Sequence, residues 1–140
     1  MAVTGNTNGL VTELLDKLNQ VSINVGKDVF VTSGKRTGDA SASSHNTGIG
    51  ADVKIEGLDT VGVCDELVNV GCSGVGEYYD TDHNPFEFAH GDIRGQAGSE
   101  QSGAYAPGGT KSNKLCWWRE GTETSGTMHF GSRLSGNSCP

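Results

Sequence analysis

Leucines recur along the first twenty residues with the spacing of an amphipathic helix. They stand three or four positions apart and comprise Leu10, Leu14, Leu15 and Leu18, separated mostly by polar residues. Because residues three and four apart share one face of a helix, this pattern predicts a helix over residues 8–20. Three residues at its start are candidates for the N-cap, namely Asn6, Thr7 and Asn8.

The next apolar segments have the patterns of strands and of one more helix. Residues 28–33 are rich in β-branched side chains, and residues 49–55 alternate between apolar and polar positions. Both patterns are typical of strands with a buried face. A second helix is expected over residues 59–70, with Asp59 or Thr60 as its cap and Gly71 as its stop.

Short strands and long polar segments complete the predicted elements. Further strands are expected at residues 74–79 and 86–93, and around Trp117. Three stretches lack periodicity: a loop at residues 34–48, an inserted loop at residues 95–115 and a turn-rich end at residues 120–140. The order of elements predicts a single α+β domain over residues 1–140, with a mainly antiparallel sheet and flanking helices.

Composition limits both the core and the partners of this fold. Leu, Ile, Val and Phe number 28 of 140 residues and Gly numbers 22, so a bound metal or disulfides are expected to supplement a modest core. The net charge of −7 argues against nucleic acid as a partner, since phosphate binding requires clustered Lys and Arg. No apolar run is long enough for a membrane span, and no signal peptide is evident at the N-terminus.

The four cysteines stand at positions 64, 72, 116 and 139 and contain no CxxC pair. This spacing argues against a cysteine zinc site. Two disulfides in an oxidising compartment are one interpretation, with Cys64–Cys72 and Cys116–Cys139 the more local of three pairings. Free buried thiols are the alternative.

Two segments concentrate residues that can bind a metal. His45 lies in the polar loop before the second strand, and Asp52 lies within that strand on its polar side. Imidazole nitrogens and carboxylate oxygens are ordinary zinc ligands, and a buried unpaired Asp would be costly. From these residues alone, a metal site and a solvated histidine both remain open.

The second segment places Glu87 three residues before His90. A carboxylate and an imidazole at this spacing would suit a metal site with a nearby proton carrier. In a regular strand, however, residues three apart point to opposite faces. The pair therefore requires a bend or bulge where the strand begins.

Taken together, these segments resemble the zinc D-alanyl-D-alanine carboxypeptidase family. The matching stretches are residues 33–36 (SGKR), residues 43–52 (SSHNTGIGAD) and residues 87–94 (EFAHGDIR). That family includes phage L-alanyl-D-glutamate endopeptidases and shares its fold with the hedgehog signalling domain. The resemblance covers residues 8–94 in the right order, although Gly50 replaces the usual Ala and the family's substrate-selecting loops are not recognisable.

The resemblance implies a role for each matching residue. His45, Asp52 and His90 correspond to the ligands of one zinc ion per chain. Glu87 corresponds to the catalytic acid/base. Arg36 corresponds to the arginine that faces the substrate carbonyl, and Ser43 to a serine near the substrate terminus.

The implied function is hydrolysis of peptidoglycan stem peptides at the bacterial cell wall, in the periplasm or outside the cell. The bond would be either D-Ala-D-Ala or L-Ala-D-Glu, and the small chain favours an endolysin-like, phage-encoded enzyme. A zinc-stabilised binding module without activity is the main alternative, and a structural domain with a decayed metal site is another. Glu87 together with Arg36 favours the enzyme, because structural zinc requires neither.

Other polar residues have ordinary interpretations beside functional ones. Asp92 and Arg94 form either a pair that supports His90 or an independent salt bridge. A calcium loop at residues 80–84 lacks the turn glycine and the closing glutamate. His83 and His129 are expected at the surface. One of Tyr78 and Tyr79 is a candidate for lining a cleft, with core packing as the default.

Overall fold

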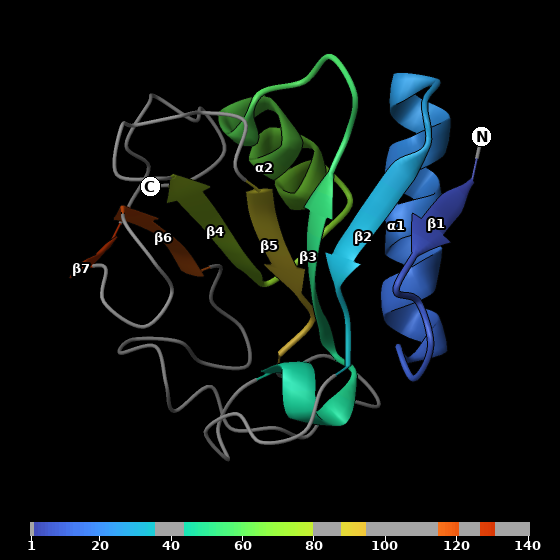
Figure 1. Cartoon of the computed structure of the whole chain (residues 1–140), viewed down its shortest axis with the longest axis horizontal. Helices are drawn as coiled ribbons and strands as arrows, with labels where there is room; N and C mark the ends of the chain where they lie inside the picture. The colour runs from blue at the N-terminus through green and yellow to red at the C-terminus, as the bar shows by residue number, and fades with distance from the viewer. Residues whose placement is uncertain (1, 36–43, 80–87, 95–114, 121–126, 131–140) are drawn as a thin grey trace.

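One β-sheet organises the part of the chain that the structure describes (Figure 1). The structure is a computed structural model, and it describes residues 2–35, 44–79, 88–94, 115–120 and 127–130. The elements in chain order are β1 (Val3–Gly5), α1 (Thr12–Val25), β2 (Val29–Ser33), the 3-10 helix η1 (Ser44–Thr47), β3 (Gly50–Lys54), α2 (Thr60–Asn69), β4 (Gly74–Tyr79), β5 (Phe88–Asp92), β6 (Leu115–Glu120) and β7 (Thr127–Phe130).

The described strands form a seven-stranded sheet in the order β1-β2-β3-β5-β4-β6-β7. Neighbouring strands are antiparallel except for the pairs β1–β2 and β4–β6, which are parallel. The prediction of an α+β fold with a mainly antiparallel sheet is therefore confirmed. The architecture is compatible with the hedgehog-like peptidase fold. The extent of a single domain over residues 1–140 stays a prediction.

Both helices cover the same face of the sheet, with α1 behind β1 and β2 and α2 behind β4 and β5 (Figure 1). The core lies between the two helices and the sheet. Its fully buried members include Leu14, Leu18, Val29, Val31, Ala51, Val53, Leu67 and Ala89. Because side chains alternate along a strand, the residues between these apolar positions point to the opposite face. That opposite face carries Asp52 and His90.

Helix α1 begins later and ends later than the leucine spacing predicts. Its N-cap is Val11, which has an extended backbone and makes no capping side-chain bond, so the predicted caps are wrong. The backbone N–H of Val11 instead donates to the carbonyl of Gly48, 3.0 Å away, which holds this residue outside the helix. The helix continues to Val25 because Val21 extends its buried stripe, and Gly26 ends it in the left-handed conformation.

The other predictions of elements are largely confirmed. Asp59 caps α2 by accepting a hydrogen bond from the backbone N–H of Gly62, 2.8 Å away. The sequence patterns missed β1, η1 and β7, and the expectation of turns throughout residues 120–140 is wrong at β7. The predicted insertion at residues 95–115 lies outside the described residues except for Leu115. No helix in the described ranges is long and apolar enough to cross a membrane.

Two of the four cysteines are free. Cys64 and Cys72 are buried thiols, so a disulfide between them is wrong. Burial raises the pKa of both, that of Cys72 to about 12. The thiol of Cys64 is directed at the carbonyl oxygen of Gly76, with 3.4 Å between sulfur and oxygen. Cys116 is disulfide-bonded, and Cys139 lies outside the described residues.

Candidate metal centre

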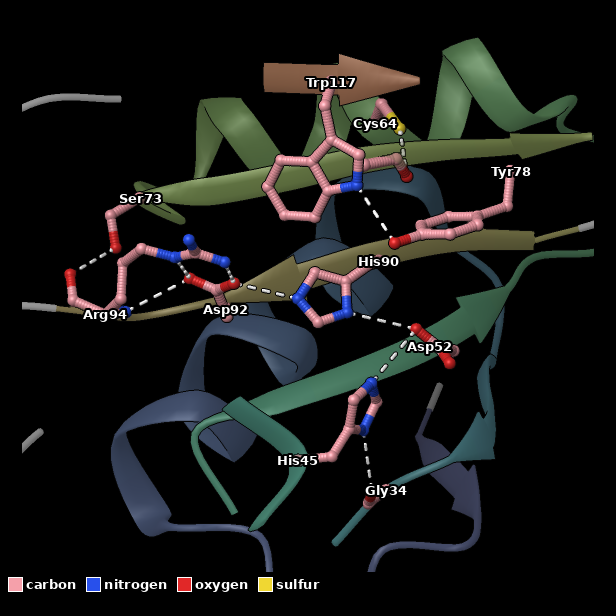
Figure 2. A network of polar contacts seen from close by, with 11 residues as sticks. Gly34, His45, Asp52, Cys64, Ser73, Tyr78, His90, Asp92, Arg94 and Trp117 are labelled. Carbon is pink, nitrogen blue, oxygen red and sulfur yellow. Dashed lines mark hydrogen bonds and ion pairs between the residues drawn. The ribbon is translucent and has the colours of Figure 1, made fainter. Parts of the chain in front are cut away.

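Three polar side chains meet on the face of the sheet opposite to α1 and α2 (Figure 2). Asp52 lies on β3 and His90 on β5, and the two residues are direct partners in the antiparallel register. His45 comes from η1, which packs against β3. All three are buried, with exposed fractions of 4% for His45, 2% for Asp52 and 3% for His90.

A glycine allows the chain to pass from η1 into β3. Gly48 has φ of +77°, and a Cβ there would lie 2.1 Å from the carbonyl oxygen of Gly9. A side chain is therefore excluded both by the left-handed backbone and by the lack of space. This turn sets the path of the chain between His45 and the start of β3, the strand that carries Asp52.

His45 is oriented by a backbone carbonyl. Its Nδ1 lies 2.8 Å from the carbonyl oxygen of Gly34. A carbonyl only accepts, so Nδ1 carries the hydrogen of this bond. The other nitrogen, Nε2, faces Oδ1 of Asp52 at 3.5 Å. In the neutral ring, Nε2 has the lone pair that a metal requires.

His90 lies between two carboxylates. Its Nδ1 is 3.1 Å from Oδ1 of Asp52, and its Nε2 is 2.8 Å from Oδ2 of Asp92. When Nε2 donates to Asp92, Nδ1 is the nitrogen directed at the shared space with Asp52 and His45. A carboxylate behind the histidine is the usual partner of a histidine that binds a metal.

Asp92 is in turn held by Arg94. The Arg94 Nε donates to Oδ1 at 2.8 Å, and Nη2 donates to Oδ2 of the same carboxylate. The guanidinium also lies over the ring of Trp117, with Cζ 5.2 Å from the ring centroid. The pair is therefore a buried salt bridge that also contacts His90 through Asp92, so the interpretation of a salt bridge independent of His90 is wrong.

Electrostatics explains how these charges tolerate burial. Burial alone would raise the pKa of Asp52, but its hydrogen bonds to His45 and His90 hold that pKa well below the usual range. Burial likewise opposes the ionisation of Asp92, and the bonds from Arg94 and His90 lower its pKa more strongly. Burial lowers the pKa of His90, yet Asp52 and Asp92 outweigh it and raise the pKa to about 9.

The donor set suits a metal such as zinc. One ligand atom from each of His45, Asp52 and His90 can be chosen so that all three lie within 4.8 Å of one another. Two imidazoles and one carboxylate form a common protein ligand set for zinc, which leaves a fourth position for water or substrate. A buried carboxylate needs compensating partners, and a bound cation would add to the compensation that the two imidazoles give Asp52.

Two glycines on β4 create the space around His90. A Cβ at Gly74 would lie 2.4 Å from the Asp92 carboxylate, and a Cβ at Gly76 would lie 2.6 Å from the ring of Trp117. Alternate glycines in a strand indicate a close approach of this kind. That signal was present in the sequence, but it does not say which side chain fills the space. The positions of Trp117 and of the Gly34 carbonyl could not be inferred from spacing.

The structure brings together the three predicted metal ligands, whereas the other predicted site residues are not described by it. Arg36, Ser43 and Glu87 lie outside the described residues. Strand β5 begins at Phe88, the residue that follows Glu87 in the sequence. The calcium loop at residues 80–84, with His83, also lies outside. His129 is exposed, as expected, and stacks on Trp118 with 4.1 Å between ring centroids.

Comparison with known proteins identifies a family. A family model described as Peptidase M15 matches residues 1–85, which include His45 and Asp52 and end before His90. No curated protein and no solved structure matches the chain.

Proposed function

This chain belongs to the peptidase M15 family, and we propose from this premise that it is a zinc metallopeptidase that hydrolyses peptidoglycan stem peptides. The family supports a metallopeptidase in general. The residues that would hold one zinc ion per chain are His45, Asp52 and His90.

The observation that carries this proposal is the convergence of those three buried side chains. A zinc ion bound there would polarise the peptide carbonyl and lower the pKa of a coordinated water to about 7. The chain prepares the site in advance. Gly34 and Asp92 fix the orientation of the two imidazoles, so little reorganisation is needed for binding.

Glu87 is the proposed general base. It stands three residues before His90 and immediately before β5. From there its carboxylate would accept the proton of the attacking water and pass it to the leaving amine. Arg36 would face the substrate carbonyl and stabilise the negative charge that develops on its oxygen. Ser43 would bind near the substrate terminus.

The substrate class follows from the resemblance of the motifs. We expect cleavage of D-Ala-D-Ala by a carboxypeptidase or of L-Ala-D-Glu by an endolysin-like endopeptidase. Either activity would act at the bacterial cell wall, in the periplasm or outside the cell. A phage origin would accord with the endopeptidase.

A zinc-stabilised binding module is the second candidate function. It would retain His45, Asp52 and His90 and would not need Glu87 or Arg36. The contact between the rings of Trp117 and the buried His90, with 5.3 Å between ring centroids, is the feature that favours it. The presence of both Glu87 and Arg36 in the sequence favours the enzyme.

Digestion of purified peptidoglycan tests the proposal. The zinc-loaded protein should release new termini that mass spectrometry can identify. Free D-Ala would indicate the carboxypeptidase, and new N-terminal D-Glu would indicate the endopeptidase. Tight zinc binding with no new terminus from peptidoglycan or from D-Ala-terminated peptides would favour the binding module.

A further inference from the structure

Two adjacent tyrosines at the end of β4 point to opposite faces of the sheet. Tyr79 is fully buried on the face that α2 covers, and its hydroxyl donates to Oε1 of Glu77 at 2.6 Å. Tyr78 is half-buried and lies on the face that carries His90. The alternation of side chains along a strand requires this division. One tyrosine therefore belongs to the core and the other to the site.

The Tyr78 ring is held from two sides. It stacks on Phe88 with ring centroids 4.6 Å apart and an interplanar angle of 14°. Its oxygen accepts a hydrogen bond from the indole Nε1 of Trp117 at 3.0 Å. A phenol oxygen can accept one hydrogen bond and donate another, and in the contact with Trp117 it accepts.

The phenol and indole rings meet above Gly76. A Cβ at Gly76 would lie 2.6 Å from the Trp117 ring and 2.8 Å from a ring carbon of Tyr78. Gly76 is the register partner of His90 on β5, so both rings lie beside the proposed metal ligand. Figure 2 shows the Tyr78 hydroxyl at Trp117 on the same side of the sheet as the His90 ring.

We propose that Tyr78 is a further catalytic residue, whose phenol donates a hydrogen bond to the substrate carbonyl oxygen as that oxygen becomes negatively charged. Trp117 is a positioning residue that holds the phenol through its indole N–H. This inference rests on the proposed function. It adds a hydrogen-bond donor to the proposed site from strand β4. A donor fixed in advance at a developing negative charge lowers the barrier without reorganisation.

The test compares Tyr78→Phe with Tyr79→Phe, which removes the same atom from the neighbouring residue. Tyr78→Phe should lower kcat by about 10² with KM little changed, the scale for losing one such donor. Zinc affinity should remain at the wild-type value. Tyr79→Phe should lower the melting temperature, because it breaks a buried bond, and leave kcat unchanged. A Tyr78→Phe variant with wild-type kcat would overturn the proposal.

Inorganic phosphate gives a readout that needs no turnover. As a tetrahedral oxyanion it resembles the form that the peptide carbonyl takes during hydrolysis. Titration calorimetry on the zinc-loaded protein should show weaker phosphate binding in Tyr78→Phe, by about tenfold or more, and wild-type binding in Tyr79→Phe. Equal affinities, or no binding to the wild type, would contradict the role of Tyr78. If Tyr78→Phe weakens phosphate binding but the wild type cleaves no peptide, the proposed function is rejected and the role of Tyr78 as a hydrogen-bond donor is retained.

A double-mutant cycle tests the role of Trp117. Trp117→Phe keeps an aromatic ring and removes the N–H, so it should lower kcat in the wild-type background. In the Tyr78→Phe background the same change should have no further effect on kcat, because the two residues act through one contact. Additive losses would show that Trp117 acts only through its packing on His90 and Arg94.

Discussion

Asp52 and His90 face each other across β3 and β5, with Oδ1 of the carboxylate 3.1 Å from Nδ1 of the ring. Their register places them on the same face at the same level of the sheet, so the contact depends on strand pairing rather than on a loop. A site built on regular strands is held more precisely than one built on loops. His45 completes the cluster from η1, oriented by the Gly34 carbonyl.

Asp92 should set the zinc affinity without being a ligand. Asp92→Asn keeps the size of the side chain and removes the charge that faces His90 Nε2. We expect zinc affinity to fall by about 10- to 100-fold, the usual effect of losing such a partner. His90→Ala should abolish stoichiometric binding. Competition with a chromophoric chelator measures the zinc affinity of both variants. A zinc affinity of Asp92→Asn equal to that of the wild type would contradict the role of Asp92.

The metal-free protein should lose stability as the pH rises from about 6.5 to about 9. The pKa of His90 is raised to about 9 in the folded state, whereas an ordinary histidine in the unfolded chain has a pKa of about 6.5. Between these values the folded state holds a proton that the unfolded state has released. The free energy of unfolding should be highest below pH 6.5 and fall until pH 9.

Thermal melts of metal-free protein across this range provide the measurement. His90→Gln, which cannot titrate, is the matched control and should show a flatter profile. Zinc binding near pH 7.5 should also release about one proton, because the metal displaces the hydrogen on Nδ1 of His90. Calorimetry in buffers of different ionisation enthalpy detects that proton, and its absence would count against the raised pKa.

Zinc should contribute to the stability of this small core. A ligand that binds only the folded state adds about 4 kcal/mol at a free concentration of about 1,000 times Kd. Chelation should therefore lower the melting temperature, and added zinc should restore it. An unchanged melt, with zinc loss verified by metal analysis, would contradict this expectation.

Gly76→Ala should disturb the site from the neighbouring strand. The added methyl group would meet the rings of Trp117 and Tyr78 well inside contact distance. We expect a loss of about 1–3 kcal/mol in the free energy of unfolding, typical of overpacking. Chemical denaturation measures the loss. Stability equal to that of the wild type would show that the rings can move away without cost.

The sequence allowed the proposed metal ligands to be identified because two short motifs carry them. His45 and Asp52 stand on one loop–strand unit, and His90 begins an alternating series with Asp92 and Arg94. Local sequence patterns do not show that the two motifs meet in the folded chain. Their meeting depends on β5 pairing with β3 across an intervening helix and strand, and local spacing contains no information about that pairing.

The features that the sequence did not reveal depend on tertiary contacts. The start of α1 is set by the hydrogen bond from Val11 to Gly48 rather than by a capping side chain. Trp117 reaches His90 only because β6 pairs in parallel with β4, which places it opposite Gly76. Strand β7 is short and is flanked by Gly, Ser and Thr, so its own pattern was too weak to predict it.

We propose that His45, Asp52 and His90 bind the metal and that Glu87 transfers the proton. Two variants separate these roles. Glu87→Gln keeps the shape of the side chain and cannot accept a proton, whereas His45→Ala removes a proposed ligand. Both would be purified with zinc, analysed for metal content and compared with the wild type on a peptidoglycan substrate that the wild type cleaves.

The decisive measurement is the hydrolysis rate of Glu87→Gln at full zinc occupancy. We expect a folded, zinc-loaded protein whose rate falls by about 10² or more, the usual scale for losing a general base. His45→Ala should lose zinc and activity together. A zinc-loaded Glu87→Gln protein that cleaves at nearly the wild-type rate would show that Glu87 is not the general base.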